Sequence, residues 1–247
     1  MEVHAHTHTP GKKWTHYFWE FFMLFLAVTL GFFVENQREH YVENQRERRY
    51  IQSFYEDLTT DERDLQSNIN FLRAQMQQAD TLQNLMADIN IKQPANHIYM
   101  YLRAITRSSA GLLYPNDRTI VQLRNAGGMR LIKNKRVSDS MVGYYRTAEI
   151  IQFITQEGVI NRRSLRQTYM PLLNAKDFSR IIDTTNAIIN VAGVLYLRKA
   201  DRDIINDCLI EIDRIKTLNL ALARRIELLK EEAGRIKDFI KKEYHLK

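Results

Sequence analysis

The chain has 247 residues, and only 9 of them are Gly and 4 are Pro. This composition excludes a turn-rich β protein and predicts an all-α fold, because tight turns between strands require both residues in number. The net charge is +7, but basic and acidic residues alternate along most of the chain. It lacks the basic, aromatic-rich strip typical of nucleic-acid binding, so nucleic acid is not an expected partner. Cys208 is the only cysteine, which excludes a disulfide within the chain.

Residues 1–13 are predicted to be a disordered tail. They include His4, His6 and His8, and alternating histidines can bind a transition metal. No acidic or cysteine cluster accompanies them, which favours a simple tail. Metal binding by these histidines stays open, and no cofactor is expected elsewhere in the chain.

Residues 14–34 are predicted to form a single transmembrane helix. Between residues 17 and 34 Glu20 is the only charge, and this part would be about 27 Å long as a helix, close to the thickness of the hydrocarbon layer. Aromatic residues suited to the membrane interface stand at its start. The side chains expected in the bilayer or at its interface include Tyr17, Trp19, Phe21, Phe25 and Val34.

Two other interpretations of this segment compete with a membrane span. A buried core helix can be equally apolar, but here phenylalanines cover every face of the helix, which suits lipid better. A cleaved signal peptide also has a short apolar core. However, the apolar run ends in the bulky residues Phe32, Phe33 and Val34, and residues 27–29 are a poor cleavage site. An uncleaved anchor is the favoured interpretation.

Residues 35–50 are predicted to form a polar stalk, that is, a solvent-exposed helix that follows the span. The segment is an internal repeat, since residues 35–42 read ENQREHYV and residues 43–50 read ENQRERRY. Glutamates and arginines three or four positions apart can pair along such a helix. The segment lacks the apolar stripe with which a helix packs against a neighbour.

Residues 51–247 are predicted to form a helical domain with two long helices. Apolar residues recur every seven positions from Ile51 to Met86, and the last helix alternates spacings of three and four, as in helices that pack along one another. Asp201 is the expected N-cap of this last helix. The first long helix exceeds the last by about 15 residues, close to the length of the stalk. We therefore expect the last helix to return antiparallel along the first and to stop near Ile51.

Shorter helices are expected between Pro94 and Ala200, where they would form a distal head. Gly158 is predicted to close one of them. The apolar run 188–197 is too short to cross a bilayer. It is interpreted as a buried helix segment, with a short strand as the alternative.

Three residues are candidates for contacts between two copies of the chain. Ala27 and Gly31 form a small-x-x-x-small pair, which would let two spans approach closely. Asn219 falls on the apolar seam of the last helix, where a buried Asn can fix the register of paired helices. The alternative is an Asn that faces solvent or bonds inside one subunit.

Two stretches of the chain carry a resemblance to a known family. The first reads WEF at residues 19–21 and GFFVENQRE at residues 31–39. The second reads TIVQLRNAGGMRLI at residues 119–132 and is followed by Tyr144 and Tyr145. These motifs resemble an uncharacterised Bacteroidota family of single-pass helical membrane proteins, a domain of unknown function. The resemblance implies a Gram-negative inner membrane and a periplasmic domain, and it assigns no catalytic residue.

The side of the membrane on which the domain lies stays open. Four arginines follow the span within residues 38–49 and two lysines precede it, so a count of basic residues places the domain in the cytoplasm. This conflicts with the periplasmic domain that the resemblance implies. Long domains cross membranes largely regardless of such charges.

The sequence predicts an anchored interaction protein rather than an enzyme. It contains no phosphate-binding loop, dinucleotide glycine fingerprint, paired-histidine zinc motif or nucleophile elbow. The leading hypothesis is a membrane-anchored helical structural or interaction protein, with the lipid bilayer, an unknown protein and a second copy of the chain as partners. The alternative is a membrane-tethered sensor or ligand-binding module, since helical bundles can bind small molecules between their helices.

Overall fold

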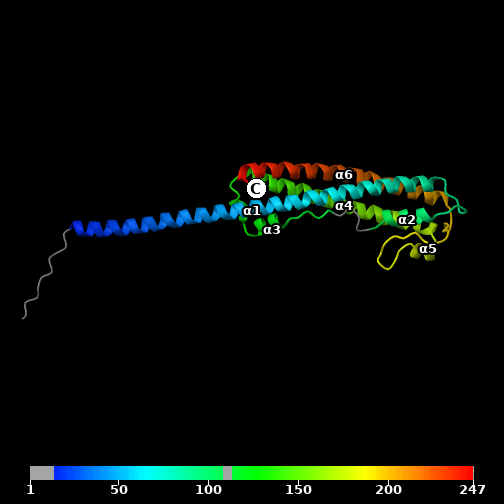
Figure 1. The fold of residues 1–247 in the computed structure, drawn as a ribbon, viewed down its shortest axis with the longest axis horizontal. Helices are drawn as coiled ribbons and strands as arrows, with labels where there is room; N and C mark the ends of the chain where they lie inside the picture. Colours follow the sequence, from blue (N-terminus) through cyan, green and yellow to red (C-terminus); the bar gives the residue numbers. More distant parts are fainter. Residues whose placement is uncertain (1–13, 108–112, 247) are drawn as a thin grey trace, which may run out of the picture. The chain divides into compact units, whose positions relative to one another are not determined.

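The all-α prediction is confirmed by a computed structural model, which describes residues 14–107 and 113–246 (Figure 1). The helix α1 covers Trp14–Ala87 and so includes the predicted span, the stalk and the first long helix of the domain. The chain divides into two compact units, residues 1–49 and residues 50–247. Each unit is described by itself below.

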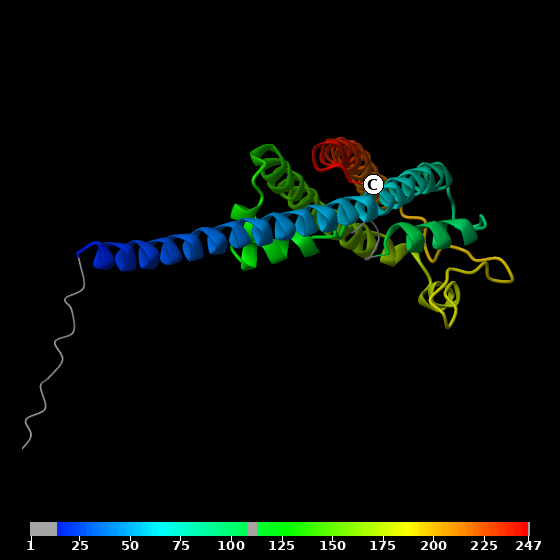
Figure 2. The ribbon, with the colours of Figure 1, turned by 60° about the vertical axis from the view of Figure 1, so that its left-hand side comes forward.

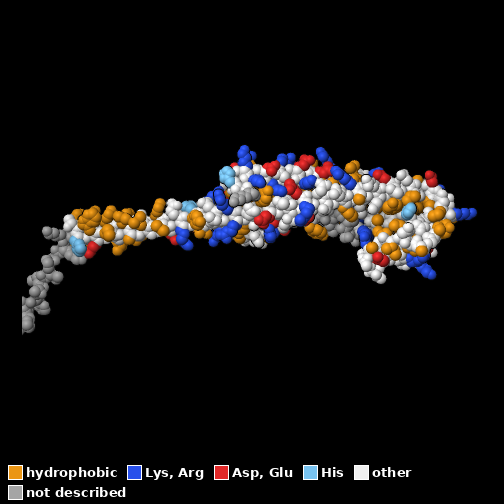
Figure 3. All heavy atoms as spheres, viewed as in Figure 1, with side chains coloured by type: hydrophobic (Ala, Val, Ile, Leu, Met, Phe, Trp, Pro, Cys, Tyr) orange, Lys and Arg blue, Asp and Glu red, His pale blue; other side chains and the backbone are white. Residues whose placement is uncertain are grey.

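In the first unit, α1 exposes large apolar side chains around its whole circumference between Trp14 and Val34. Apolar side chains cover most of this stretch in Figure 3, and none of its most apolar 18-residue window is buried. The hydroxyl of Thr29 donates to the carbonyl of Phe25 at 2.8 Å, as expected for a polar side chain in an apolar helix. In the stalk, Arg38 pairs with Glu35, as the repeat predicts.

The second unit is a bundle of the up-down-up-down type. Its long members are α1 from residue 50 onward, α4 (Lys135–Tyr169) and α6 (Arg202–Tyr244), which lie side by side in Figures 1 and 2. The other member is split into α2 (Asn96–Ile105) and α3 (Arg118–Asn125). The short helical elements of the unit are η1 (Gly128–Leu131), η2 (Met170–Leu172) and α5 (Ala175–Arg180).

The helix α6 packs antiparallel against α1, as predicted. Asp201 caps α6 by accepting from the backbone N–H of Ile204 at 3.3 Å. At the other end, Ile240 shares a hydrophobic cluster with Ile51, whereas Met86 belongs to a different cluster. Polar contacts that join the two helices include Glu62–Lys237, Gln66–Lys230, Arg73–Glu227, Asp80–Lys216 and Ala87–Arg202.

The core of the second unit consists of two separate hydrophobic clusters. The first contains residues of α1 up to Leu72 and residues of α6 from Leu222 onward. The second begins at Ala79 on α1 and ends at Ile215 on α6. In the region between the two clusters, the side chains of α1, α4 and α6 that face inward are polar.

Two expectations about the middle of the chain are wrong. Gly158 does not close a helix, because α4 continues through it to Tyr169. The run 188–197 is not helical, and its β pairing is confined to an isolated bridge between Ile182 and Ile188. It belongs to a connection that loops away from α5 (Figure 2).

Polar side chains of α2 hold residues 193–196 of this connection. The side chain of Asn96 donates to the carbonyl of Gly193 at 2.8 Å and accepts from the N–H of Leu195 at 2.9 Å. Tyr99 donates its hydroxyl to the carbonyl of Tyr196 at 3.1 Å. Because these groups satisfy the backbone, Leu195 can be buried in the core without helix formation.

The position of Cys208 leads to a test of the packing of α6. Its side chain is fully buried in the second cluster, and burial raises the pKa of the thiol to about 12. At pH 8 such a thiol is ionised to about one part in ten thousand. We expect iodoacetamide to leave Cys208 unmodified in the native protein and to label it completely in guanidinium chloride.

A single cysteine at an exposed position of the same helix provides the control. Ile210 is 52% exposed, so Ile210→Cys combined with Cys208→Ala should be labelled rapidly in the native state. Equal labelling rates for the two proteins, measured by mass spectrometry, would contradict the packing of α6.

Candidate functional site

A buried polar layer, formed by Gln75, Arg162 and Asn219, separates the two hydrophobic clusters. The three residues come from α1, α4 and α6, and all are less than 5% exposed. The Nη2 atom of Arg162 donates to Oε1 of Gln75 at 3.0 Å and to Oδ1 of Asn219 at 3.4 Å. Nε of Arg162 and Nδ2 of Asn219 are buried without a hydrogen-bond partner among the described residues.

The guanidinium of Arg162 is a buried cation held by neutral amides. No carboxylate of the described residues forms an ion pair with it, and burial lowers its pKa. A buried charge without a partner of opposite sign opposes folding. The polar layer therefore fixes the axial register of three helices relative to one another, and it lowers the stability of the fold.

Gly158 lies directly against this guanidinium. A Cβ atom at residue 158 would lie 2.6 Å from Nη1 of Arg162, too close for two atoms that are not bonded. Because Arg162 is 3% exposed, it cannot swing into solvent to avoid the contact. The glycine is thus required inside α4 for packing and not as a helix stop.

A second polar cluster, formed by Asp57, Asp61, Thr119, Tyr144 and their neighbours, joins α1 to α3 and α4. Asp57 is fully buried and accepts from the side chain of Arg118 at 3.0 Å and from the N–H of Thr119 at 3.1 Å. Asp61 accepts from the hydroxyl of Tyr144 at 2.7 Å and from the N–H of Asn116 at 2.8 Å. Each carboxylate is occupied by donors within the chain, so both hold the split member of the bundle in place.

An open pocket of about 1000 Å³ lies among α2, the end of α4, α5 and the connection after α5. This volume is at the upper end of the range for small-molecule sites. Its lining is mainly apolar and aromatic, with two arginines and no acidic residue. The lining residues are Arg103, Tyr169, Met170, Pro171, Leu173, Asn174, Ala175, Phe178, Ser179, Ile182 and Arg198.

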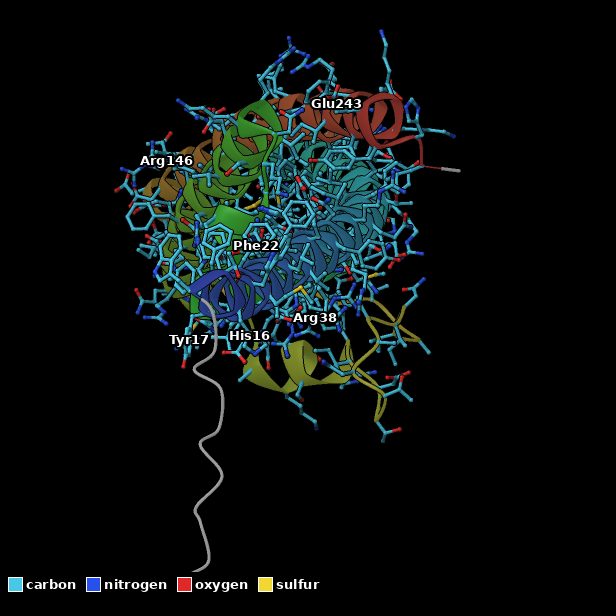
Figure 4. All side chains as sticks on the ribbon, turned by 90° about the vertical axis from the view of Figure 1, so that its left-hand side faces the viewer. His16, Tyr17, Phe22, Arg38, Arg146 and Glu243 are labelled. Carbon is cyan, nitrogen blue, oxygen red and sulfur yellow. The ribbon has the colours of Figure 1, made fainter. Side chains whose placement is uncertain are left out.

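The side chains predicted to contact the membrane are exposed on the first unit. Tyr17, Trp19, Phe21, Phe25 and Val34 are between 54% and 68% exposed. Figure 4 shows Tyr17 and Phe22 pointing to different sides of α1.

The single charge of the predicted span and its small-residue pair also lie in the first unit. Glu20 is paired with His16 at 3.1 Å. Ala27 is exposed, and the space around Gly31 is open. Self-association through this pair stays a prediction.

Asn219 is buried inside a single chain, where it accepts a hydrogen bond from Arg162. This is the arrangement of an Asn bonded within one subunit, and a contact to a second copy would require the bundle to open. His4, His6 and His8 lie outside the described residues. Within residues 14–107 and 113–246, no group of three His, Cys, Asp or Glu side chains is arranged to hold a metal ion.

Sequence reasoning missed Arg162, Gln75 and the pocket. Gln75 and Arg162 interrupt the apolar seams of their helices, and Asn219 interrupts a third, which is a signal for a shared polar layer. No comparable pattern marks the pocket, because its wall combines residues 169–182 with Arg103 of α2 and Arg198 of the connection after α5. Comparison of the chain with protein-family models, curated proteins and solved structures finds no match. The resemblance to a Bacteroidota family stays a prediction.

The contact between Gly158 and Arg162 predicts the effect of an alanine at residue 158. Gly158→Ala should reduce the free energy of unfolding by about 1–3 kcal/mol, the usual range for overpacking, although alanine favours helix formation. The matched control is Gly143→Ala in the same helix, where a Cβ meets nothing within 4 Å. It should raise stability by about 0.5–1 kcal/mol.

A double mutant separates the clash from any general effect of residue 158. In an Arg162→Met background, Gly158→Ala should lose most of its cost, because the guanidinium is absent. Urea unfolding followed by circular dichroism measures all four variants. The same cost with and without Arg162 would refute the contact as its cause.

The burial of Asp61 predicts a pH dependence of stability. Burial raises the pKa of this carboxyl, and hydrogen bonds from Tyr144 and Asn116 oppose the rise. A folded-state pKa above the unfolded value means that the folded protein binds the proton more readily. The contribution of Asp61 to stability should therefore increase as the pH falls through the raised pKa towards the unfolded value of about 3.9.

The comparison is between the natural protein and Asp61→Asn, in which residue 61 does not titrate. Between pH 7.5 and pH 4, the difference in unfolding free energy should shift in favour of the natural protein. Asp203→Asn is the control, since it makes the same substitution at an exposed position of α6. A shift in favour of Asp61→Asn would contradict the argument.

Proposed function

We propose that this protein is a membrane-anchored helical interaction protein whose second unit, residues 50–247, is held at a membrane by a single span at residues 14–34. One observation carries the proposal. The apolar stretch of α1 has none of its most apolar window buried, and its large side chains are exposed on all faces. In water such a surface is unfavourable by roughly 25 cal/mol per Å², whereas in lipid it has no such penalty.

The exposure also bears on the alternative of a soluble core helix. A core helix would bury its apolar window within the protein, and this window is not buried in the described residues. The cleaved signal peptide is the remaining alternative. The membrane proposed is the inner membrane of a Gram-negative cell, as the sequence resemblance implies, and partners are proposed to bind the second unit.

The proposal assigns no catalytic role. The buried acids Asp57 and Asp61 are engaged by donors of the chain itself, and the buried Arg162 by two amides. Both arrangements support a role in fixing the bundle. The second candidate function is a membrane-tethered ligand-binding module, which the pocket beside α5 favours.

Charged substitutions in the span test the anchor. Arginine costs about 2.5–3.5 kcal/mol at the centre of a transmembrane helix, so Leu24→Arg with Val28→Arg should release the full-length protein from membranes washed with alkaline carbonate. The unchanged protein should resist extraction. Tyr41→Arg is the matched control, because Tyr41 is 65% exposed on α1 outside the apolar stretch.

The same preparation distinguishes an anchor from a cleaved signal peptide. N-terminal sequencing of the membrane-bound protein should give a start before Trp14. A start after Val34, or extraction of the unchanged protein by carbonate, would refute the anchor.

A further inference from the structure

The charge of the pocket beside α5 indicates what it can bind. Arg103 and Arg198 line it, and none of the lining residues is acidic. Among the described residues, neither guanidinium forms an ion pair with a carboxylate. The acidic residue of α5, Asp177, is bound to Arg180, which does not line the pocket. Two cations of the pocket wall are therefore available to an anion.

Both arginines are held in position by the fold. The guanidinium of Arg103 lies over the ring of Phe178, 4.8 Å from its centroid, and a cation–π contact of this kind uses the charge of the guanidinium and not its N–H donors. The backbone N–H of Arg198 donates to the carbonyl of Leu172 at 2.8 Å. The connection that carries Arg198 is tied to α2 through Asn96 and Tyr99.

The rest of the pocket is suited to an apolar body. Tyr169 and Leu173 are buried in its wall, and Phe178 and Ile182 are partly exposed. The phenol of Tyr169 bonds to the hydroxyl of Thr106 at 3.2 Å, so its polar tip is already satisfied. A ligand would meet mainly hydrocarbon and aromatic surface, with cationic donors from two separate elements.

We propose that this pocket binds a small amphipathic carboxylate, that is, a free monomer with an apolar acyl or aromatic body and one carboxylate. The planar carboxylate would accept paired N–H donors from the arginines, and the body would cover the apolar wall. The inference rests on the ligand-binding function proposed second above and names its ligand class. It does not depend on the anchor, because every lining residue belongs to the second unit.

The test is titration calorimetry of the full-length protein in phosphatidylcholine nanodiscs at pH 7.5, with empty nanodiscs subtracted. Three probes share one chain length: decanoate, decanol and decyltrimethylammonium. We expect saturable binding of one decanoate per chain, with decanol and the cation at least about tenfold weaker, since a hydrogen bond to a charged group exceeds a neutral one.

Matched variants locate the site. Arg103→Gln with Arg198→Gln should weaken decanoate at least about tenfold and leave decanol unchanged. Arg224→Gln is the control, because Arg224 is exposed on α6 and outside the pocket. Ser179→Phe should abolish binding of decanoate by filling the pocket, with thermal unfolding confirming that the variant folds.

The outcomes separate two failures. Decanol binding as tight as decanoate, or decanoate binding unchanged by the double arginine variant, would overturn the carboxylate assignment while the pocket remains a ligand site. No binding of any of the three probes would overturn both this assignment and the ligand-binding function. Decanoate binding in phosphatidylcholine nanodiscs but not in phosphatidylglycerol nanodiscs would mean that the anionic lipid competes for the pocket. This result would identify an anionic lipid headgroup as the occupant and overturn the proposal of a free carboxylate.

Discussion

The second unit depends on one buried cation that is held without an anion. Arg162 lies between two apolar clusters and is bonded to one amide from α1 and one from α6. The apolar residues of long helices pack almost equally well after a shift of one heptad, so they fix the register of a bundle weakly. A shift of α4 by one heptad would move the guanidinium into one of the apolar clusters, where it would lack both amides. The polar layer thus selects one register among several of similar apolar burial.

The layer also explains local features that would otherwise oppose stability. Gly158 weakens the middle of α4, but a larger residue would collide with Arg162. Asn219 stands at a buried position of α6 where an apolar side chain would otherwise pack, and its Oδ1 accepts a hydrogen bond from the guanidinium. The Asp57 and Asp61 cluster performs a related task, since it fixes α3 to α1 although the second member of the bundle is split. Specific polar contacts therefore hold the interrupted member of the bundle in place, where a continuous helix would otherwise do so.

Much of the fold could be predicted from the sequence because it depends on periodicity and caps. The antiparallel return of α6, its cap at Asp201 and its end near Ile51 all follow from apolar spacing and helix length. The failures have a common physical cause. Gly158 was predicted as a stop because local propensity disfavours it, but a tertiary contact with Arg162 determines its role. The run 188–197 has enough apolar residues for a helix, but side chains of Asn96 and Tyr99, about a hundred residues away in the sequence, bond the backbone of its residues 193–196.

The pocket depends on the same irregular connection. A helix at residues 188–197 would satisfy its own backbone, so Asn96 and Tyr99 of α2 would not position the segment that leads to Arg198. In the structure, Leu195 and Leu197 are buried, and the hydrogen bond from Arg198 to Leu172 follows directly after them. Burial of these two leucines in a non-helical segment thereby fixes a cation at the wall of the pocket. The spacing of apolar residues in a sequence indicates which residues are buried. The hydrogen-bond partners of the backbone decide where the neighbouring exposed side chains, such as that of Arg198, are placed.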